Sequence, residues 1–188
     1  MKLFILLFFT AVLTLNAQEN KLKSVTDEKT GRQMLVGVAN RSAFQDTSYS
    51  RWFNPEYDNY RVKTKDLAGL SDKIKDYGIT IVMGTWCSDS HREIPRFYKI
   101  LDTLKYPGSK VKLIMVDKKR KDLSGEVDSL NIELVPTIIF YKDGKEEGRI
   151  TEAPQETLEK DTFNIVTGTS KKKSESGDSD KKDNNEAD

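Results

Sequence analysis

Cysteine and histidine are almost absent from this chain of 188 residues, which has one of each, Cys87 and His91. A single cysteine excludes a disulfide bond within the molecule, so burial of apolar surface must stabilise the fold. A zinc site needs three or four ligands, and Cys87, Asp89 and His91 crowd into one turn without a second cluster elsewhere in the sequence. We therefore expect no bound metal and no other cofactor.

An excess of charge of one sign is also lacking. The formal net charge is +1, and the charged residues, 32% of the chain, alternate in sign along the sequence. Such a chain has no electrostatic means of capturing nucleic acid, so we expect no nucleic-acid partner. A glycine-rich phosphate loop and a serine nucleophile elbow are absent too, which argues against phosphate-binding and serine-hydrolase chemistry.

Long apolar runs are lacking except at the N-terminus, where Lys2 precedes an apolar stretch from Leu3 to Leu15 and Ala17 follows. This pattern predicts a signal peptide over residues 1–17. The stretch is shorter than the roughly 20 residues that span a bilayer, so we expect cleavage near Ala17 and no stable membrane anchor. The mature protein is then exported, to a periplasm or to the medium. At the other end, residues 168–188 have Ala187 as their only apolar side chain and are predicted to form a disordered charged tail.

Residues 64–167 have the alternating pattern of an α/β domain. Leu67, Leu70 and Ile74 recur at helical spacing before Gly78, and a nearly continuous apolar run follows, as in a strand buried on both faces. The expected helices cover 67–74, 94–104, 123–130 and 154–166, and the expected strands cover 79–83, 111–116, 135–141 and 145–150. The last two strands are joined by Asp143-Gly144 as a hairpin. This order predicts a mixed central sheet flanked by helices, with the functional site beyond the first of these strands.

Residues 18–63 form an N-terminal extension, in which an aromatic-rich segment over 39–61 shows no clear period. Its rings are Phe44, Tyr49, Trp52, Phe53, Tyr57 and Tyr60. We expect a structural extension whose rings pack against the core, because burial of aromatic rings contributes strongly to stability. The alternative is that the segment forms one wall of a substrate groove.

The motifs around Cys87 resemble those of the thioredoxin family. Trp86-Cys87-Ser88-Asp89-Ser90 is similar to the family's Trp-Cys-Gly-Pro-Cys loop, with Ser90 at the position of the resolving cysteine. Pro95 matches the proline in the family's active-site helix, and Val135-Pro136-Thr137 matches its cis-proline loop. The resemblance covers roughly residues 64–166 and implies a thioredoxin-like fold.

The resemblance also implies roles for individual residues. Cys87 would be the nucleophile, Trp86 and Pro136 would shape the substrate groove, and the main chain of Val135 would pair with an extended substrate. Ile81 stands where many thioredoxins bury an aspartate that serves the resolving thiol. The loss of this acid agrees with the loss of the resolving thiol itself.

A lone thiol at a helix N-terminus can still act as a nucleophile, because free backbone N–H groups and the helix dipole favour the thiolate. Asp89 would oppose its ionisation. His91 would favour it if the ring turns back to the sulfur, and is otherwise an exposed residue of the first turn. Ser90 is expected to hold the thiolate by a hydrogen bond or to serve as a helix cap.

The resulting hypothesis is monothiol exchange with protein or small-molecule disulfides and thiols, completed by an external reducing thiol. One alternative is a non-catalytic binding module that retains the peptide groove without redox activity. Another is a homodimer linked through Cys87, since an odd cysteine in an oxidising compartment can pair with a second copy.

Overall fold

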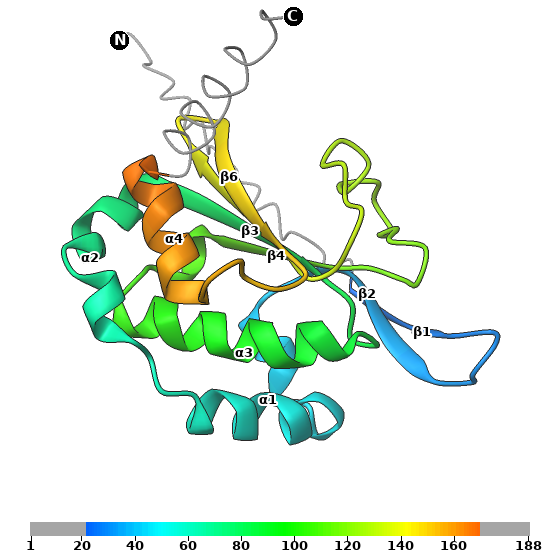
Figure 1. The fold of residues 1–188 in the computed structure, drawn as a ribbon. Coiled ribbons are helices and arrows are strands. Elements are labelled where there is room, and N and C mark those ends of the chain that lie inside the picture. The colour runs from blue at the N-terminus through cyan, green and yellow to red at the C-terminus, as the bar shows by residue number, and fades with distance from the viewer. Residues whose placement is uncertain (1–21, 170–188) are drawn as a thin grey trace, which may run out of the picture.

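A computed structural model of the chain describes residues 22–169 (Figure 1). The predicted signal peptide, and the predicted tail beyond Thr169, lie outside this range. The described part is a mixed α/β structure around a six-stranded sheet, as predicted. The sheet order is β1-β2-β4-β3-β5-β6. The strands are β1 (Lys23–Thr26), β2 (Gln33–Ala39), β3 (Tyr77–Met83), β4 (Val111–Met115), β5 (Thr137–Lys142) and β6 (Lys145–Thr151).

The central strand β3 leads directly to Cys87. It pairs in parallel with β4 and antiparallel with β5, so that Ile81 lies between Leu113 and Ile138. Ile79, Ile81 and the other apolar residues up to Met83 are buried, because both faces of the strand are covered. The predicted hairpin is present as β5 and β6, with its turn at Asp143 and Gly144.

Helices cover one face of the sheet in two layers. Helix α3 (Ser88–Thr103) and helix α4 (Leu158–Thr167) lie on the sheet, and helix α1 (Thr47–Asn59) lies outside α3 (Figure 1). Phe97 of α3 and Phe140 of β5 are both fully buried and meet edge to face, with ring centroids 6.0 Å apart. Burial of these aromatic and branched side chains is the main stabilising contribution in a chain without disulfides.

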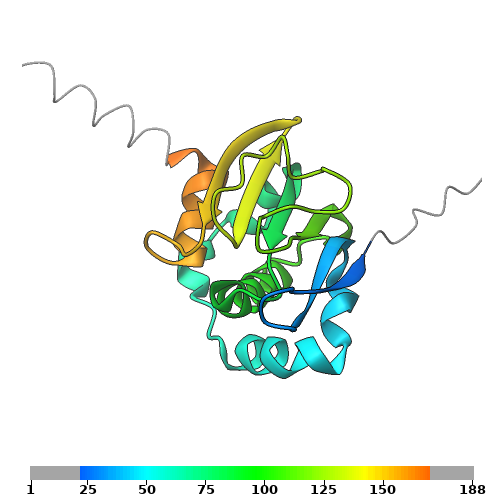
Figure 2. The ribbon, with the colours of Figure 1, turned by 90° about the vertical axis from the view of Figure 1, so that its right-hand side faces the viewer.

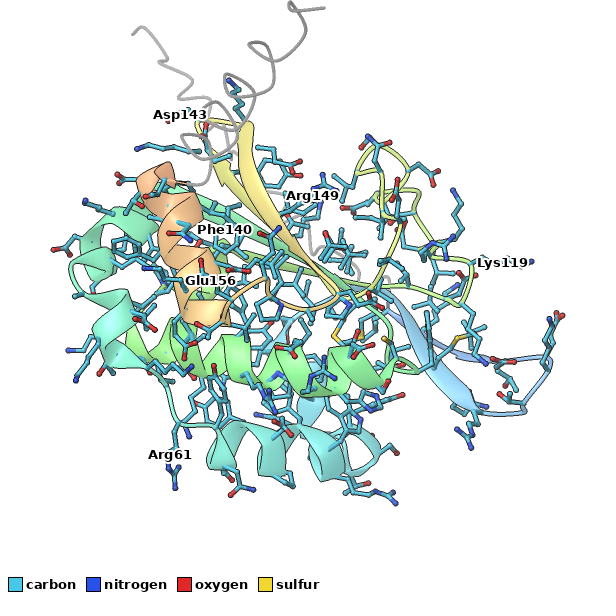
Figure 3. The ribbon with its side chains drawn as sticks, viewed as in Figure 1. Arg61, Lys119, Phe140, Asp143, Arg149 and Glu156 are labelled. Atoms are coloured by element: carbon cyan, nitrogen blue, oxygen red, sulfur yellow. The ribbon has the colours of Figure 1, made fainter. Side chains whose placement is uncertain are left out.

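The opposite face carries a smaller apolar cluster and no helix within the described range. Val82, Ile114 and Val116 of the sheet region pack there with Val127 and Val135, from the segment that follows β4. Figure 3 shows this segment with Lys119 at its outer end and Arg149 of β6 facing it. Arg149 donates to the carbonyl of Leu130 at 3.0 Å, which ties the segment to the sheet.

The helix expected over 123–130 was wrong, because this segment forms turns. The carboxylate of Asp122 accepts hydrogen bonds from the N–H groups of Ser124 and Val127. Gly125 adopts a left-handed conformation with φ of 73°. A side chain that binds its own downstream backbone competes with helix formation, and a left-handed residue interrupts it.

Two other expected helices differ in extent. The segment expected as a helix over 67–74 has only four α-helical residues, α2 (Leu70–Lys73), between two 3-10 turns, and β3 already begins before Gly78. The last helix begins at Leu158 instead of Pro154, with Thr157 as its N-cap. The carboxylate of Asp161 binds the N–H groups of Gln155 and Glu156, which holds the preceding residues as a loop.

The N-terminal extension is more regular than its sequence suggested. It supplies β1, β2 and the 13-residue helix α1, whose N-cap Asp46 accepts from the N–H of Ser48 at 2.8 Å. The expected packing of aromatic rings against the core is confirmed: Phe44 and Phe53 are buried and stack with centroids 4.6 Å apart. Tyr49, Trp52, Phe53 and Tyr57 in fact follow helical spacing, and this period was the overlooked signal.

Candidate active site

Cys87 is the N-cap residue of α3 and lies at the end of the loop that leaves β3. Its N–H donates to the carbonyl of Gly84 at 3.0 Å, and its own carbonyl accepts from the N–H of His91 at 3.1 Å. Its side chain is partly exposed and forms no disulfide. The fold therefore presents the one thiol of the chain at the start of a long helix, within reach of solvent.

The thiol faces the loop that precedes β5. The Val135–Pro136 peptide bond is cis, as the resemblance implied, and Cys87 Sγ donates to the carbonyl oxygen of Val135 at 3.2 Å. Val135 and Pro136 are both buried, whereas the neighbouring Leu134 is 45% exposed. Two segments nearly fifty residues apart in sequence thus form one site, with an apolar side chain exposed at its rim.

Trp86 has a fixed orientation beside the cysteine. Its indole N–H donates to the carbonyl of Val116 at 2.9 Å. Its ring also covers Gly84 so closely that a Cβ atom there would lie 2.5 Å from Cε2 of Trp86. Glycine at this position is what allows the ring to lie flat against the backbone.

Ser90 is fully buried, and its hydroxyl oxygen accepts from the N–H of Gly84 at 3.4 Å. Within residues 22–169 it makes no hydrogen bond to Cys87 Sγ, so the expected support of the thiolate by this hydroxyl is not seen. Nor is Ser90 the cap of α3, since Cys87 occupies that position. Ser90 instead ties the first turn of α3 to the end of β3.

His91 is directed to a carbonyl group and an aromatic ring. Its Nε2 lies 2.8 Å from the carbonyl oxygen of Thr85, a distance at which Nε2 must carry a proton and donate. The ring stacks on Trp52 of α1, with centroids 4.1 Å apart and planes 13° apart. Within residues 22–169 the ring makes no hydrogen bond to the sulfur of Cys87, and the side chain is partly buried, so neither of the two expected positions is found.

The negative charge of Asp89 next to the thiol has a positive partner. The guanidinium of Arg92 contacts the carboxylates of Asp89 at 2.8 Å and Glu93 at 2.5 Å. The hydrogen bond to Glu93 is the largest cause that raises the pKa of Arg92, so this cation persists at any physiological pH. This one cation is shared by two carboxylates, Asp89 and Glu93, so it compensates the charge of Asp89 beside the thiol only in part.

Two further features of the described residues bear on function. In the range 22–169, no group of three or more histidine, cysteine, aspartate or glutamate side chains is arranged to hold a metal ion. Over the same range, no helix combines the length and apolar character needed to cross a bilayer.

Comparisons with known proteins identify the family. The family model described as Thioredoxin matches residues 68–163, just over half of the chain. No curated protein sequence matches significantly. Among solved structures, a Pseudomonas aeruginosa protein of unknown function is 15% identical, covers 74% of this chain and 93% of its own, and gives a TM-score of 0.41.

Two thioredoxins are similar over shorter stretches. Thioredoxin O2 of Arabidopsis thaliana is 21% identical, with a TM-score of 0.33 and coverage of 57% of this chain and 86% of its own. Fasciola hepatica thioredoxin is also 21% identical, with a TM-score of 0.32 and coverage of 47% and 80%. The family model matches a segment that holds Cys87, Pro95 and Pro136. This match shows that the chain belongs to the thioredoxin family.

Proposed function

We propose that this protein is an exported thiol-disulfide exchange factor in which Cys87 is the only nucleophile. The observation that carries the proposal is the pairing of a partly exposed Cys87 at the N-terminus of α3 with the cis Val135–Pro136 loop. The family generally acts on thiol or disulfide substrates. In this chain Trp86 and Pro136 line the groove, and the main chain of Val135 pairs with an extended substrate.

The reaction has two steps that balance in sulfur and electrons. The thiolate of Cys87 attacks one sulfur of a substrate disulfide, forming a mixed disulfide and releasing the other substrate sulfur as a thiolate. An external thiolate then attacks the mixed disulfide, frees Cys87 and leaves joined to the substrate sulfur. Over the two steps, the sulfur of the external thiol is oxidised, one substrate sulfur is reduced to a thiol, the other substrate sulfur remains in a disulfide with the external thiol, and Cys87 returns unchanged.

Ser90 is the reason that the second thiol must come from outside. It lies one helical turn after Cys87, fully buried, and a hydroxyl group cannot displace a sulfur from a mixed disulfide. Its hydrogen bond with Gly84 gives it a role in holding the loop. The chain therefore suits exchange or isomerisation of mixed disulfides and cannot reduce a protein disulfide autonomously.

A second candidate is a binding module that retains the groove without redox activity. It is favoured by the fact that, within the described range, neither Ser90 nor His91 makes a hydrogen bond to the sulfur. In such a module the hydrogen bond from Cys87 to Val135 would only shape the groove, and a partner would bind equally well to a Cys87→Ser variant.

The rate at which Cys87 forms an adduct with oxidised glutathione at neutral pH separates the two candidates. The reference is the same chain unfolded in urea, whose thiol has no structured surroundings. An exchange factor reacts faster when folded and releases the adduct on addition of excess thiol, and Cys87→Ser gives no adduct. Equal rates for the folded and unfolded chains would exclude the exchange function.

Export is a separate part of the proposal and rests on residues 1–17 alone, where Lys2, the apolar stretch from Leu3 and Ala17 follow the signal-peptide pattern. Expression of the full chain in a bacterial host should give a mature protein in the periplasm or medium that begins near Gln18. A product that retains Met1 in the cytoplasm would contradict export.

Non-reducing electrophoresis of the same preparation tests the Cys87-linked homodimer. A monomeric band in oxidising buffer would exclude this dimer.

A further inference from the structure

A cavity of about 320 Å³ lies on the side of the active-site loop that faces the N-terminal extension. The turn between β1 and β2, the start of α1 and the start of α3 lie on the same side of the molecule (Figure 2). Residues that line the cavity include Arg32 and Met34 of the hairpin, Tyr49 and Trp52 of α1, and Trp86 and His91 at the site. Its volume falls at the lower end of the roughly 300–1,000 Å³ typical of small-molecule sites.

Specific contacts hold the walls of the cavity in place. The N–H of Leu35 in β2 donates to Oγ1 of Thr85 at 3.0 Å, which joins the hairpin to the active-site loop. Asp27, buried in the hairpin, pairs with Lys118 beyond β4. The stacked rings of Trp52 and His91 join α1 to α3. The hairpin, α1 and the start of α3, which form the walls of the cavity, are therefore held in place by contacts with one another and with the active-site loop.

The charges around the cavity favour an anion. Lys118 and Asp27 neutralise each other, and the hydrogen bond from Lys118 is the largest cause that lowers the pKa of Asp27 to about 2. Arg32 also lines the cavity, and over residues 22–169 its guanidinium has neither an ion pair nor a side-chain hydrogen bond. A planar guanidinium without a partner is well suited to bind a carboxylate through two parallel hydrogen bonds.

Neutral donors and aromatic surface complete the lining. In the described part of the chain, the hydroxyl groups of Ser48 and Tyr49 and the indole N–H of Trp52 make no hydrogen bond, although all three side chains line the cavity. Burial raises the pKa of Tyr49, so its hydroxyl keeps its proton and can donate. Trp52 and Trp86 supply apolar surface for the part of a ligand that carries no charge.

We propose that this cavity binds a small disulfide or thiol that carries a carboxylate, and thereby selects the substrate of Cys87. The carboxylate binds Arg32, and the apolar chain lies along Trp52 and Trp86. Cys87 itself does not line the cavity, but Trp86 directly before it does, and so does His91, whose N–H donates to the carbonyl of Cys87, so the cavity lies beside the loop that carries the thiol. This inference rests on the proposed exchange function and adds the chemical class of its substrate.

Three small disulfides of similar length test the selection: dithiodipropionate, which is anionic, hydroxyethyl disulfide, which is neutral, and cystamine, which is cationic. For each reagent, the rate of adduct formation at Cys87 in the folded chain is divided by the rate in the urea-unfolded chain, which removes the intrinsic reactivity of the reagent. The folded chain should favour the anionic reagent over the other two. Because Arg32 is exposed, Arg32→Gln should lower that rate by a factor of about five at most, the upper end for one exposed charge pair, and leave the neutral reagent unchanged.

Arg120→Gln is the matched control, because Arg120 is an exposed arginine that does not line this cavity. It removes the same net charge and should alter none of the three rates. If Arg120→Gln slows the anionic reagent as much as Arg32→Gln does, the preference comes from net charge and the inference is overturned. Equal normalised rates for all three reagents overturn it as well, while leaving the exchange function intact.

A binding measurement separates this inference from the exchange function. Cys87→Ser cannot form an adduct but retains every residue of the lining, so dithiodipropionate should still quench its tryptophan fluorescence saturably. The additional change Arg32→Gln should shift the saturation to about fivefold higher concentration of dithiodipropionate. If Cys87 is unreactive in the native chain but this binding is present, the exchange function fails and the anion site stands. The absence of saturable binding in Cys87→Ser would overturn the anion site.

Discussion

The two sides of Cys87 differ in origin. On one side lies the cis Val135–Pro136 loop, which belongs to the segment that the family model matches. On the other side lie Trp52 and the β1–β2 hairpin, which precede that segment. The first side holds the sulfur itself, through the 3.2 Å hydrogen bond to Val135, whereas the second is joined to His91 and Thr85 beside it. The difference teaches that the shared fold positions the nucleophile, whereas the extension, on our proposal, shapes what can approach it.

The largest change on the family side should come from restoring a second thiol with Ser90→Cys. Ser90 is one turn after Cys87 in α3, so a thiol there can attack a mixed disulfide formed on Cys87. The variant should release the substrate without added thiol and form a disulfide between Cys87 and the introduced thiol, which mass spectrometry detects. Ser90→Ala, which adds no thiol, should leave the mixed disulfide as persistent as in the native chain. A persistent adduct in Ser90→Cys would contradict the proposed geometry.

Gly84→Ala should distort the same side by displacing Trp86. The new methyl group would meet the indole ring at 2.5 Å, and the ring cannot yield without losing its hydrogen bond to Val116. We expect a loss of about 3 kcal/mol in the free energy of unfolding, measured by urea denaturation. Gly78→Ala is the control, since a Cβ atom there meets nothing within 4 Å. Similar losses in both variants would show that packing against Trp86 is not the cause.

Trp52→Ala removes the ring that joins the extension to the active site. Because Trp52 is only partly buried, we expect a loss of about 2 kcal/mol in the free energy of unfolding, below that of a fully buried tryptophan. The rate of Cys87 with hydroxyl-bearing neutral disulfides should change little, because Val135 still holds the sulfur. Trp52→Phe should retain stacking on His91 and most of the stability. If Trp52→Ala greatly lowers the rate at which Cys87 reacts with a neutral disulfide, the extension also positions the nucleophile.

The smallest effect concerns the ion pair between Asp27 and Lys118, whose contribution to stability is lost at acid pH. The pKa of Asp27 falls from 3.8 to about 2 on folding, so its contribution to stability is fully present above about pH 4 and is lost as the pH falls towards 2. Asp27→Asn should therefore be less stable than the native chain at pH 5, and the difference should shrink by pH 2.

The exposed pair of Asp76 and Lys142, 3.9 Å apart, provides the control for this titration. Asp76→Asn should show a smaller difference at pH 5, because an exposed pair at this distance contributes little. If the free energies of unfolding of the two variants change with pH in the same way, the β1–β2 hairpin is not held by a specific ion pair between Asp27 and Lys118.

The family side of the site was predictable because local motifs determine it. The apolar run before Cys87, the helical stripe after it and the hairpin around Asp143-Gly144 each appear in the structure at nearly the expected residues. The cis state of Pro136 followed from the resemblance and is confirmed. Here sequence pattern and tertiary packing favour the same structure, which is the condition under which such predictions succeed.

The extension side was less predictable because its structure depends on contacts distant in sequence. Tyr49, Trp52, Phe53 and Tyr57 follow the helical spacing of α1, although the segment showed no clear period among its other aromatic residues and α1 contains Pro55. Strand β2 pairs with β4, more than seventy residues later, and no local signal identifies that partner. The same limitation applies to His91, whose stacking on Trp52 requires a rotamer that sequence does not reveal.

The lifetime of the mixed disulfide on the native chain tests the central claim most directly. The chain is treated with oxidised glutathione at neutral pH, free thiol is removed, and the adduct at Cys87 is followed by mass spectrometry before and after reduced glutathione is added. The account predicts an adduct that forms faster than on the unfolded chain, persists without thiol and is released when thiol is added. An adduct that forms no faster than on the unfolded chain, or that is released without added thiol, would contradict a single nucleophile that depends on an external partner.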